Sequence, residues 1–262
     1  MAKEVFNRHE NKYLMNRDSY EKLQEKLLYY MDIDEYNKTN EMYTICNLYY
    51  DTKDDHLIRT SLSKPKYKEK LRIRAYGVPK EDEEVYLEIK KKVYGLVNKR
   101  RTTIKLEEAY DFATTGIKPE RKEYMNKQVM NELEYMFKVY DLEPKLYLAY
   151  DRKAFFSKIN RDLRITFDTN IRTRRYDLAL ESGDYGESLL EENQWLMEVK
   201  AEKSIPIWLS RLLSENKIYK ISFSKYGAEY KKMLLSNQPQ KGETKICLKQ
   251  YSILPQLRPL YL

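Results

Sequence analysis

Histidine and cysteine are scarce in this chain, which narrows the chemistry that it can carry. The 262 residues include two histidines and two cysteines. A Ser–His or Cys–His nucleophile would have to use His9, in a charged stretch, or His56, at the start of a short predicted helix. Cys46 and Cys247 form no CxxC spacing, so we expect neither a zinc site nor a disulfide framework. Any bound metal must then rely on carboxylates, which favours Mg²⁺ or Mn²⁺.

Glycine motifs and long apolar runs are missing as well. The seven glycines form no GxGxxG, GxxxxGK(S/T) or GxSxG pattern, which argues against P-loop, Rossmann and α/β-hydrolase folds. No apolar run approaches the length of a bilayer span, and the first residues do not form a signal peptide. Together with the cysteine usage, these absences predict a soluble, cytoplasmic protein.

Positive charge is in excess. The chain has 49 Lys and Arg against 41 Asp and Glu, a formal net charge of +8. An acidic partner is therefore expected: nucleic acid, an anionic membrane surface or a phosphate-rich small molecule. No repeat or low-complexity linker interrupts the chain, so we predict one domain over residues 1–262, with a core at about 5–235 and a tail at 236–262.

Three consecutive strands predicted between residues 67 and 101 carry their charges in register. In the first strand, every second position is a cation, so four cations share one face: Lys68, Lys70, Arg72 and Arg74. The second strand places Glu88 and Lys90 on one face, and the third carries a basic run at 99–101. An alternating charged face is usually a solvated face. Because the same pattern recurs in strands far apart in the chain, we favour a face that holds a polyanion.

The remaining sequence predicts further strands and several helices. Strands are expected near residues 6–13, 42–51, 145–157, 163–172 and 195–201, with a short one near 178–180 and a terminal strand or arm at 246–254. Helices are expected near 17–31 with Asn16 as N-cap, and near 54–62, 106–113, 120–140, 205–215 and 226–235. This pattern predicts an α+β fold.

A closed or nearly closed antiparallel sheet would direct the alternating cations into one lumen. The predicted interior cations are Arg8, Lys12, Lys70, Arg72, Arg74, Lys90, Arg101, Arg152, Arg164 and Lys200. Such a set repels itself unless a polyanion neutralises it, so we expect the filled lumen to hold phosphates. Glu10, Glu88 and Glu198 lie among the cations, and carboxylates beside phosphates are what a divalent ion needs.

A set of short motifs runs in order from about residue 5 to residue 230. They are RHENKY at 8–13, LRIR at 71–74, LEIK at 87–90 followed by Gly95 and KRR at 99–101, YDR at 150–152, EVK at 198–200, IPIW at 205–208 and FSKY at 223–226. Each motif is weak alone. Together they resemble the VTC-type polyphosphate polymerase domain, which belongs with the CYTH proteins to the triphosphate tunnel metalloenzymes.

The resemblance implies an antiparallel β-barrel with peripheral helices, a triphosphate tunnel that processes nucleoside triphosphates. In the polymerase branch the γ-phosphate of ATP is moved onto a growing inorganic polyphosphate chain with Mn²⁺ or Mg²⁺, so the expected ligands are ATP, phosphate or pyrophosphate, and polyphosphate. The implied catalytic residues are Arg72, Arg74, Lys90, Arg152, Arg164 and Lys200. The expected phosphate-binding residues are Arg8, Lys12, Lys70, Arg101, Tyr150, Ser224 and Lys225. The implied metal ligand is Glu198, with Glu10 and Glu88 as further candidates.

The chain departs from its relatives at two points. The hydrolytic CYTH branch opens with an ExExK signature, whose place is taken here by Arg8-His9-Glu10-Asn11-Lys12, and this favours the polymerase branch. The phosphate-sensing domain and membrane segments of the eukaryotic proteins are also missing, so a membrane partner that exports the product stays an open question.

Two other functions and one other role for Glu198 remain open. A triphosphatase would use the same tunnel with water as acceptor, hydrolysing a nucleoside triphosphate or inorganic triphosphate. A nucleic-acid-binding module would expose aromatic rings beside its cations. We do not expect nucleic acid as a partner, because Tyr49, Tyr147 and Phe167 are predicted on the opposite, apolar face. Glu198 could also be a structural counter-ion.

Overall fold

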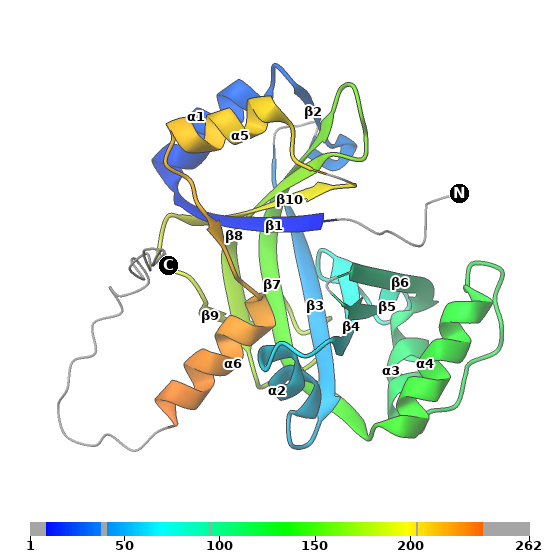
Figure 1. Ribbon diagram of the computed structural model, residues 1–262. Helices are drawn as coiled ribbons and strands as arrows, with labels where there is room; N and C mark the ends of the chain where they lie inside the picture. Colours follow the sequence, from blue (N-terminus) through cyan, green and yellow to red (C-terminus); the bar gives the residue numbers. More distant parts are fainter. Residues whose placement is uncertain (1–8, 38–40, 95, 203, 238–262) are drawn as a thin grey trace, which may run out of the picture.

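One strongly curved antiparallel sheet of eleven strands is the frame of the fold (Figure 1). The computed structural model describes residues 9–37, 41–94, 96–202 and 204–237. The predicted site residue Arg8 and the predicted strand or arm at 246–254 lie outside these residues. The strands are β1 (His9–Asn16), β2 (Met31–Ile33), β3 (Tyr43–Thr52), β4 (Tyr67–Tyr76), β5 (Glu84–Val93), β6 (Leu96–Lys105), β7 (Leu142–Ser157), β8 (Arg164–Arg174), β9 (Glu187–Ser188), β10 (Gln194–Ala201) and β11 (Lys220–Ile221).

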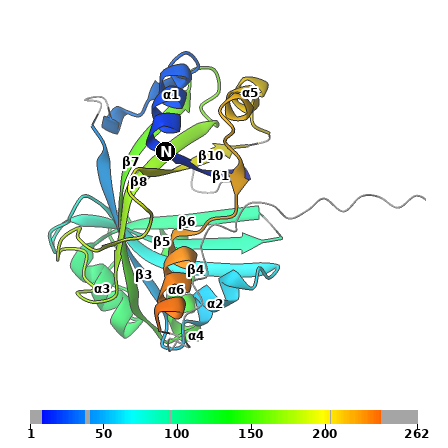
Figure 2. The ribbon, with the colours of Figure 1, turned by 90° about the vertical axis from the view of Figure 1, so that its left-hand side faces the viewer.

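The strand order in the sheet differs strongly from the order in the chain. Neighbouring strands follow the sequence β11-β1-β10-β8-β7-β3-β4-β5-β6, with β2 added to β7 and β9 added to β8. The strands β4, β5 and β6 form a meander that lies nearly across β3 and β7, as the second view shows (Figure 2). In the described part of the chain, no ladder of hydrogen bonds joins the edge strands β6 and β11. The sheet therefore curls into a tunnel-like shape without closing into a complete barrel.

Four helices cover the convex face of the sheet in two pairs (Figure 1). Helices α3 (Leu106–Thr115) and α4 (Lys127–Val139) lie against β4, β5 and β6, where Phe112 and Leu133 pack on Ile73 and Leu87. Helices α1 (Arg17–Leu27) and α5 (Ile207–Glu215) cover β1, β8 and β10. These two apolar layers bury the outward-facing half of each alternating strand.

The remaining two helices lie on the concave face. Helix α2 (His56–Leu62) contributes Ile58, and α6 (Lys225–Ser236) contributes Tyr226 and Tyr230, to an apolar cluster with Tyr49 and Leu148. A short 3-10 helix, η1 (Glu35–Asn37), precedes β3. Helices α2 and α6 thus fill the apolar part of the concave face, and the charged part next to it forms the lumen.

The structure confirms the α+β fold and most elements, and it corrects several boundaries. The Asn16 side chain caps α1 by accepting from Ser19 N at 2.9 Å, as predicted. The helix expected at 120–140 begins only at Lys127, because the Asn126 side chain caps it there by accepting from Val129 N at 3.1 Å. The short strands β2 and β11 were not predicted; such brief strands leave little periodicity to detect.

The strand predicted near 178–180 is wrong. The buried Arg174 guanidinium donates to the backbone carbonyls of Asp177, Ala179, Gly183 and Tyr185 at 2.7–3.0 Å. These carbonyls are held by a side chain and not by a neighbouring strand, so the segment forms a loop. The short strand of this region is β9 instead.

Candidate functional site

Glu88 is the centre of the cationic surface formed by β4, β5 and β6. Its side chain is 1% exposed, and Arg72 donates to its Oε2 from Nε at 2.8 Å and from Nη2 at 2.7 Å. Lys99 Nζ lies 2.5 Å from Oε1, and Arg74 Nε lies 3.9 Å from Oε2. Burial alone would raise the pKa of Glu88, but Arg74, Arg72 and Lys99 hold it well below its usual value. Burial lowers the pKa of Lys99 well below its usual value, although Glu88 acts in the other direction. One ionised carboxylate therefore balances only part of the charge of the two arginines and Lys99.

Neutral side chains orient the two arginines of β4. Arg74 donates from Nε to Asn47 Oδ1 at 2.9 Å and from Nη2 to Tyr150 Oη at 3.0 Å. Arg72 donates from Nη1 to Tyr49 Oη at 3.0 Å. A neutral acceptor fixes a guanidinium without cancelling its charge, so Arg74, whose Nε lies 3.9 Å from the nearest Glu88 oxygen, stays available to an anion.

The prediction that Tyr49 lies on the opposite, apolar face is wrong. In the register of β3 with β4, Tyr49 stands opposite Arg72, and paired residues share a face. Phe167 does pack on the convex side, with Tyr20 and Phe155. Tyr147 lies in the convex cluster as well, beneath Arg174.

Glu198 on β10 lies on the other wall of the lumen, across from the surface formed by β4, β5 and β6. Lys12 Nζ lies 3.1 Å from Oε1, Lys225 Nζ lies 3.6 Å from Oε1, and Lys200 Nζ lies 3.3 Å from Oε2. Burial would raise the pKa of Glu198, but Lys12, Lys200 and Lys225 hold it well below its usual value. Burial lowers the pKa of Lys200 to about 8, although Glu198 and Glu10 act in the other direction.

Asp168 on β8 is a second carboxylate on this side of the lumen and contacts two cations. It is fully buried and accepts from Arg152 Nε at 2.6 Å and Nη2 at 2.8 Å, while Lys225 Nζ lies 2.5 Å away. Burial would raise its pKa, but Arg152 and Lys225 keep it below its usual value. Asp168 thus positions two predicted phosphate ligands, and it was not among the predicted site residues.

Arg164 and Thr166 bring unused hydrogen-bonding groups to the lumen. Arg164 donates to Asp34 at 3.3 Å and its guanidinium lies 4.9 Å from the centre of the Phe156 ring. Arg164 Nε and Thr166 Oγ1 are buried and have no hydrogen-bond partner among the described residues. In the ladder of β8 with β10, Thr166 stands opposite Glu198 and Arg164 opposite Lys200. Both groups are therefore placed to meet a ligand beside Glu198.

Lys70 links the two walls at the beginning of α6. Its Nζ donates to Ser224 Oγ at 3.1 Å, and Ser224 caps the helix by accepting from Gly227 N at 3.2 Å. Burial, together with the positive charges of Lys90 and Lys12, lowers the pKa of Lys70 to about 7. The positive charge and the burial of the free lumen thus disfavour the charged form of one of its own lysines.

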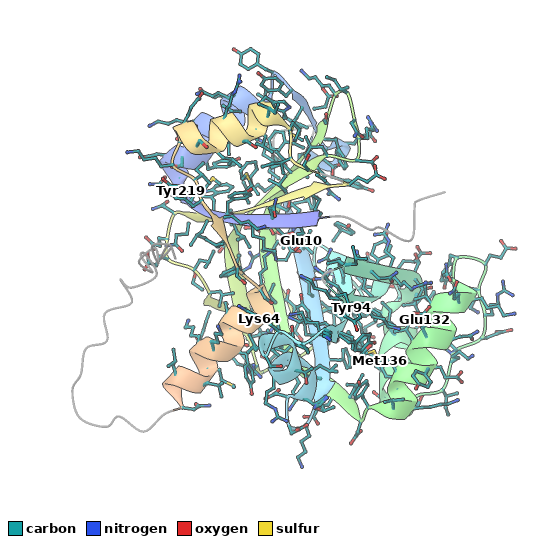
Figure 3. All side chains as sticks on the ribbon, viewed as in Figure 1. Glu10, Lys64, Tyr94, Glu132, Met136 and Tyr219 are labelled. Atoms are coloured by element: carbon teal, nitrogen blue, oxygen red, sulfur yellow. The ribbon has the colours of Figure 1, made fainter. Side chains whose placement is uncertain are left out.

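Glu10 and Lys90 close the lumen from two strands that are far apart in the sheet order. Glu10 Oε2 lies 3.3 Å from Lys90 Nζ and Oε1 lies 3.3 Å from Lys12 Nζ. Figure 3 shows Glu10 beneath β1, on the side of the lumen. Burial would raise the pKa of Glu10, but Lys90, with Lys200 and Lys12, lowers it to about 2.

The lumen assembles nearly all of the predicted site residues within the described part of the chain. The cations outnumber the carboxylates; they are Lys12, Lys70, Arg72, Arg74, Lys90, Lys99, Arg101, Arg152, Arg164, Lys200 and Lys225. Sequence reasoning missed Lys99, although it stands at an alternate position before Arg101, and it missed Asp168 and Thr166, which share a face with Arg164.

The carboxylates of the lumen differ in how well they suit a metal. Among the described residues no group of three His, Cys, Asp or Glu side chains is arranged to hold an ion. Glu10 and Glu198 both contact Lys12 at 3.1–3.3 Å and are ionised, and two carboxylates supplemented by substrate phosphates fit Mg²⁺ or Mn²⁺. Glu88 is enclosed by cations, a geometry that suits a counter-ion.

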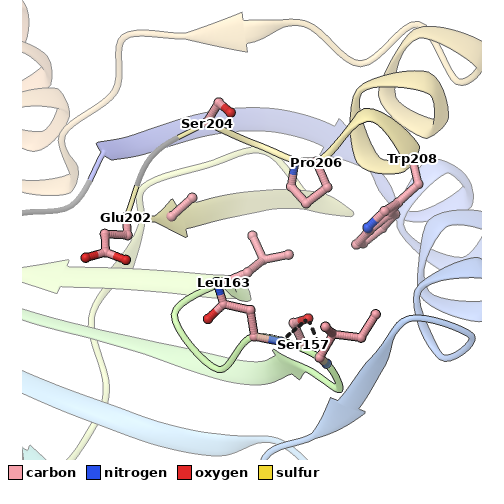
Figure 4. Close-up of a pocket in the computed structure, with 9 residues that line it drawn as sticks. Ser157, Leu163, Glu202, Ser204, Pro206 and Trp208 are labelled. Atoms are coloured by element: carbon pink, nitrogen blue, oxygen red, sulfur yellow. Dashed lines mark hydrogen bonds between the residues drawn. The ribbon is translucent and has the colours of Figure 1, made fainter.

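A separate cavity of about 370 Å³ lies outside the lumen. It is lined by Ser157, Leu163, Glu202, Pro206 and Trp208, between the β7–β8 turn and the segment that leads into α5 (Figure 4). None of the lumen cations lines it. This cavity carries no arrangement of charges comparable to that of the lumen.

Comparisons with known proteins concern the fold and the family of this chain. Among solved structures, a Bacillus halodurans protein provisionally described as an adenylate cyclase has a TM-score of 0.54 and 15% identity, over 85% of this chain and 96% of that chain. A Vibrio parahaemolyticus protein with the same provisional description has a TM-score of 0.45 and 15% identity, over 88% and 98% of the two chains. No curated protein matches the sequence.

The fold is therefore shared with the Bacillus halodurans protein, whose sequence is very different. Of the helices in the described ranges, none is both long and apolar enough to cross a lipid bilayer.

The sequence model of the VTC domain matches residues 7–234, which include every described residue of the lumen. The chain belongs to the VTC domain family.

Proposed function

We propose that this protein is a polyphosphate polymerase that transfers the γ-phosphate of ATP to a growing inorganic polyphosphate chain, with Mn²⁺ or Mg²⁺. The main support is the concave face on which fixed cations outnumber carboxylates. Arg72, Arg74 and Arg152 are held there by side-chain partners at 2.6–3.0 Å. Membership of the VTC domain family supports the same activity.

The proposed reaction needs no nucleophile from the protein. A terminal phosphate oxygen of the acceptor, already anionic near neutral pH, attacks the γ-phosphorus in line. The bond from that phosphorus to the β–γ bridging oxygen breaks, and ADP leaves with the bonding electrons. Preorganised cations around the transferred group stabilise its charge without reorganising during the reaction. The scarcity of histidine, with two in the 262 residues, is consistent with this chemistry.

The two walls of the lumen take different parts in the proposal. The arginines of β4 and β7 hold the transferred phosphoryl group, and Lys12, Lys200 and Lys225 bind neighbouring phosphates. Glu198, with Glu10, would hold the divalent ion. That ion would supply additional neutralisation of the phosphate charge.

Incubation with ATP and Mn²⁺, followed by gel electrophoresis with a polyphosphate stain, tests the proposal. We expect long anionic chains, and equimolar ADP for each phosphate incorporated. Free phosphate without chains would contradict the polymerase and would support a triphosphatase that hydrolyses nucleoside triphosphate or inorganic triphosphate in the same lumen. The protein treated with EDTA is the control.

Single-stranded nucleic acid is the competing ligand, since Tyr49 and Tyr150 lie on the cationic face. We expect polyphosphate to displace a labelled oligonucleotide at low concentration. An oligonucleotide that binds tightly and resists polyphosphate would contradict the proposal.

A further inference from the structure

Four tyrosines form a contiguous cluster at one end of the lumen. Tyr76 is the centre: its ring centroid lies 6.1 Å from that of Tyr36, 5.9 Å from Tyr43 and 5.8 Å from Tyr86. The Tyr36 and Tyr76 rings are nearly parallel, with an angle of 10° between their planes. The four residues come from η1, β3, β4 and β5, so the cluster exists only in the folded protein.

The cluster continues the cationic face along the strands. Tyr76 follows Arg72 and Arg74 at the next alternate position of β4, and Tyr86 stands opposite Arg74 on β5. Tyr76 lies four positions after Arg72 on the strand, which is about 14 Å at 3.4 Å per residue. A triphosphate bound along the arginines therefore places whatever is attached to it beside these rings.

The rings of the cluster are accessible to a ligand. The exposed fraction of Tyr36 is 77% and that of Tyr76 is 49%. The Arg101 guanidinium lies 4.6 Å from the centre of the Tyr86 ring, and it forms no ion pair with any carboxylate in the described ranges. An exposed aromatic surface with an unpaired cation at its inner edge suits a ligand that has a planar ring at one end and a phosphate at the other.

The other end of the same three strands is different. There the face carries Lys68 paired with Lys92 across the β4–β5 ladder, and Tyr94 is 75% exposed without a tyrosine neighbour among the described residues. Its contact is with Lys66, whose Nζ lies 5.5 Å from the ring centre. The two ends of the lumen thus differ in chemistry, and only one offers an aromatic surface of several rings.

We propose that the nucleobase of the triphosphate substrate stacks on Tyr36 and Tyr76 at this end of the lumen, with Arg101 on the adjoining phosphate. The inference rests on the proposed function in that it takes a nucleoside triphosphate as substrate. It adds that the protein distinguishes a nucleotide from inorganic triphosphate by this cluster. Because a purine offers the larger ring face, purine nucleotides bind more tightly than pyrimidine nucleotides.

Calorimetric binding of ATP and of inorganic tripolyphosphate, each without added metal so that turnover does not interfere, tests the inference. Tyr76→Ala and Tyr36→Ala each weaken ATP binding by roughly ten- to a hundredfold, the range expected for the loss of one base–aromatic stack. Their affinity for tripolyphosphate stays within twofold of the wild type. Tyr76→Phe, which keeps the ring, retains ATP binding.

Matched controls separate stacking from general damage. Tyr135→Ala removes a tyrosine that is 70% exposed on α4 and should change neither affinity. Equal losses for ATP and tripolyphosphate in Tyr76→Ala would show a purely structural role and overturn the inference. Weaker ATP binding in Tyr94→Ala but not in Tyr76→Ala would place the base at the other end and also overturn it.

The outcome is distinguishable from failure of the proposed function. If the wild type binds tripolyphosphate and ATP, but the tyrosine variants bind ATP normally, the lumen is a triphosphate site without a base subsite. If the wild type binds ATP through the tyrosines and yet forms no polyphosphate, the base subsite stands and the polymerase assignment fails.

Discussion

Lys90 Nζ lies 3.3 Å from Glu10 Oε2, although five strands separate β5 from β1 in the sheet order. The pair therefore joins two parts of the curled sheet across the lumen. The Lys90 side chain is 40% exposed and that of Glu10 is 16% exposed, so the pair lies at the edge of the lumen and not in its centre.

Glu10→Gln should loosen this link and make the lumen still more basic. We expect a lower thermal midpoint, because Lys90 and Lys12 lose a carboxylate at 3.3 Å, and several-fold tighter binding of tripolyphosphate without metal. Added tripolyphosphate should restore the midpoint by linkage. Thermal melts with and without tripolyphosphate measure both effects. An unchanged affinity would show that the charge of Glu10 does not act on the bound tripolyphosphate.

Arg72→Ala and Arg100→Ala form a matched pair on β4 and β6. Arg72 contacts buried Glu88 in the lumen, whereas Arg100 contacts Glu132 of α4 at 3.3 Å on the outer side. We expect Arg72→Ala to lower polymerisation by at least a hundredfold, by analogy with the loss of one transition-state donor. Arg100→Ala should stay within about twofold, since its ion pair with Glu132 lies outside the lumen. Similar rates for both variants would contradict the placement of the reaction on the concave face.

Glu198→Gln separates a metal ligand from a counter-ion. As a ligand, its loss leaves metal-free ATP affinity unchanged or stronger, while metal-dependent transfer falls by several orders of magnitude. As a counter-ion of Lys12, Lys200 and Lys225, its loss lowers stability and leaves the metal dependence of the remaining activity as in the wild type. Titration of activity with Mn²⁺ and a thermal melt of the same variant distinguish the two. We expect the first outcome.

Lys70 makes anion binding depend on pH. Its pKa in the free protein is about 7, so it is largely neutral at pH 8, and phosphates nearby favour its charged form. Binding of tripolyphosphate at pH 8 should therefore take up a proton, and affinity should fall as the pH rises above 7. Calorimetry in buffers of different ionisation enthalpy measures the uptake. Lys70→Met should remove the contribution of this group; uptake that persists unchanged would contradict its assignment.

The same shift has a consequence for the stability of the free protein. An unfolded lysine has a pKa of about 10.4, so between about pH 7 and pH 10 the unfolded chain binds the extra proton. By linkage, the contribution of Lys70 to the free energy of unfolding increases as the pH rises through this window. At pH 7 the lowered pKa of Lys70 makes the wild type less stable than Lys70→Met. We expect this difference in the free energy of unfolding to shrink from pH 7 to pH 10 in denaturant titrations.

Arg174 has a structural role that is independent of the lumen. It is 2% exposed, donates to four backbone carbonyls and stacks on Tyr147, with its guanidinium 3.5 Å from the ring centre. Arg174→Ala should lower the free energy of unfolding by about 3–5 kcal/mol, because buried carbonyls lose their partners. Denaturant titration measures the change, and ATP affinity below the melting range should stay close to that of the wild type. A stability loss under 1 kcal/mol would contradict this role.

Alternation along single strands was readable from the sequence. Because side chains of a strand point to opposite faces in turn, Arg72 and Arg74 had to share a face, as did Glu88 and Lys90. The convex apolar face followed from the complementary positions, such as Ile73 and Leu87. The alternation thus predicted most cations of the lumen, while the antiparallel tunnel was implied by the resemblance to the VTC domain.

Contacts between distant strands and the ends of some helices could not be predicted from the sequence. Tyr49 was placed on the wrong face, because a single strand has no marker for which of its two faces meets the cations until its register with β4 is known. Lys99 and Asp168 were missed because their role consists of fixing arginines and lysines from other strands.

The sequence by itself determined which residues of each strand lie together, since the period of two is a local property of extended backbone. Only the tertiary structure decided which partner each charge meets: Glu10 with Lys90, Lys70 with Ser224, Arg164 with Asp34. It also decided that Tyr36, Tyr43, Tyr76 and Tyr86 gather at one end of the lumen. These juxtapositions depend on the curvature of the sheet and on the order of its strands, which arise from packing across the whole chain.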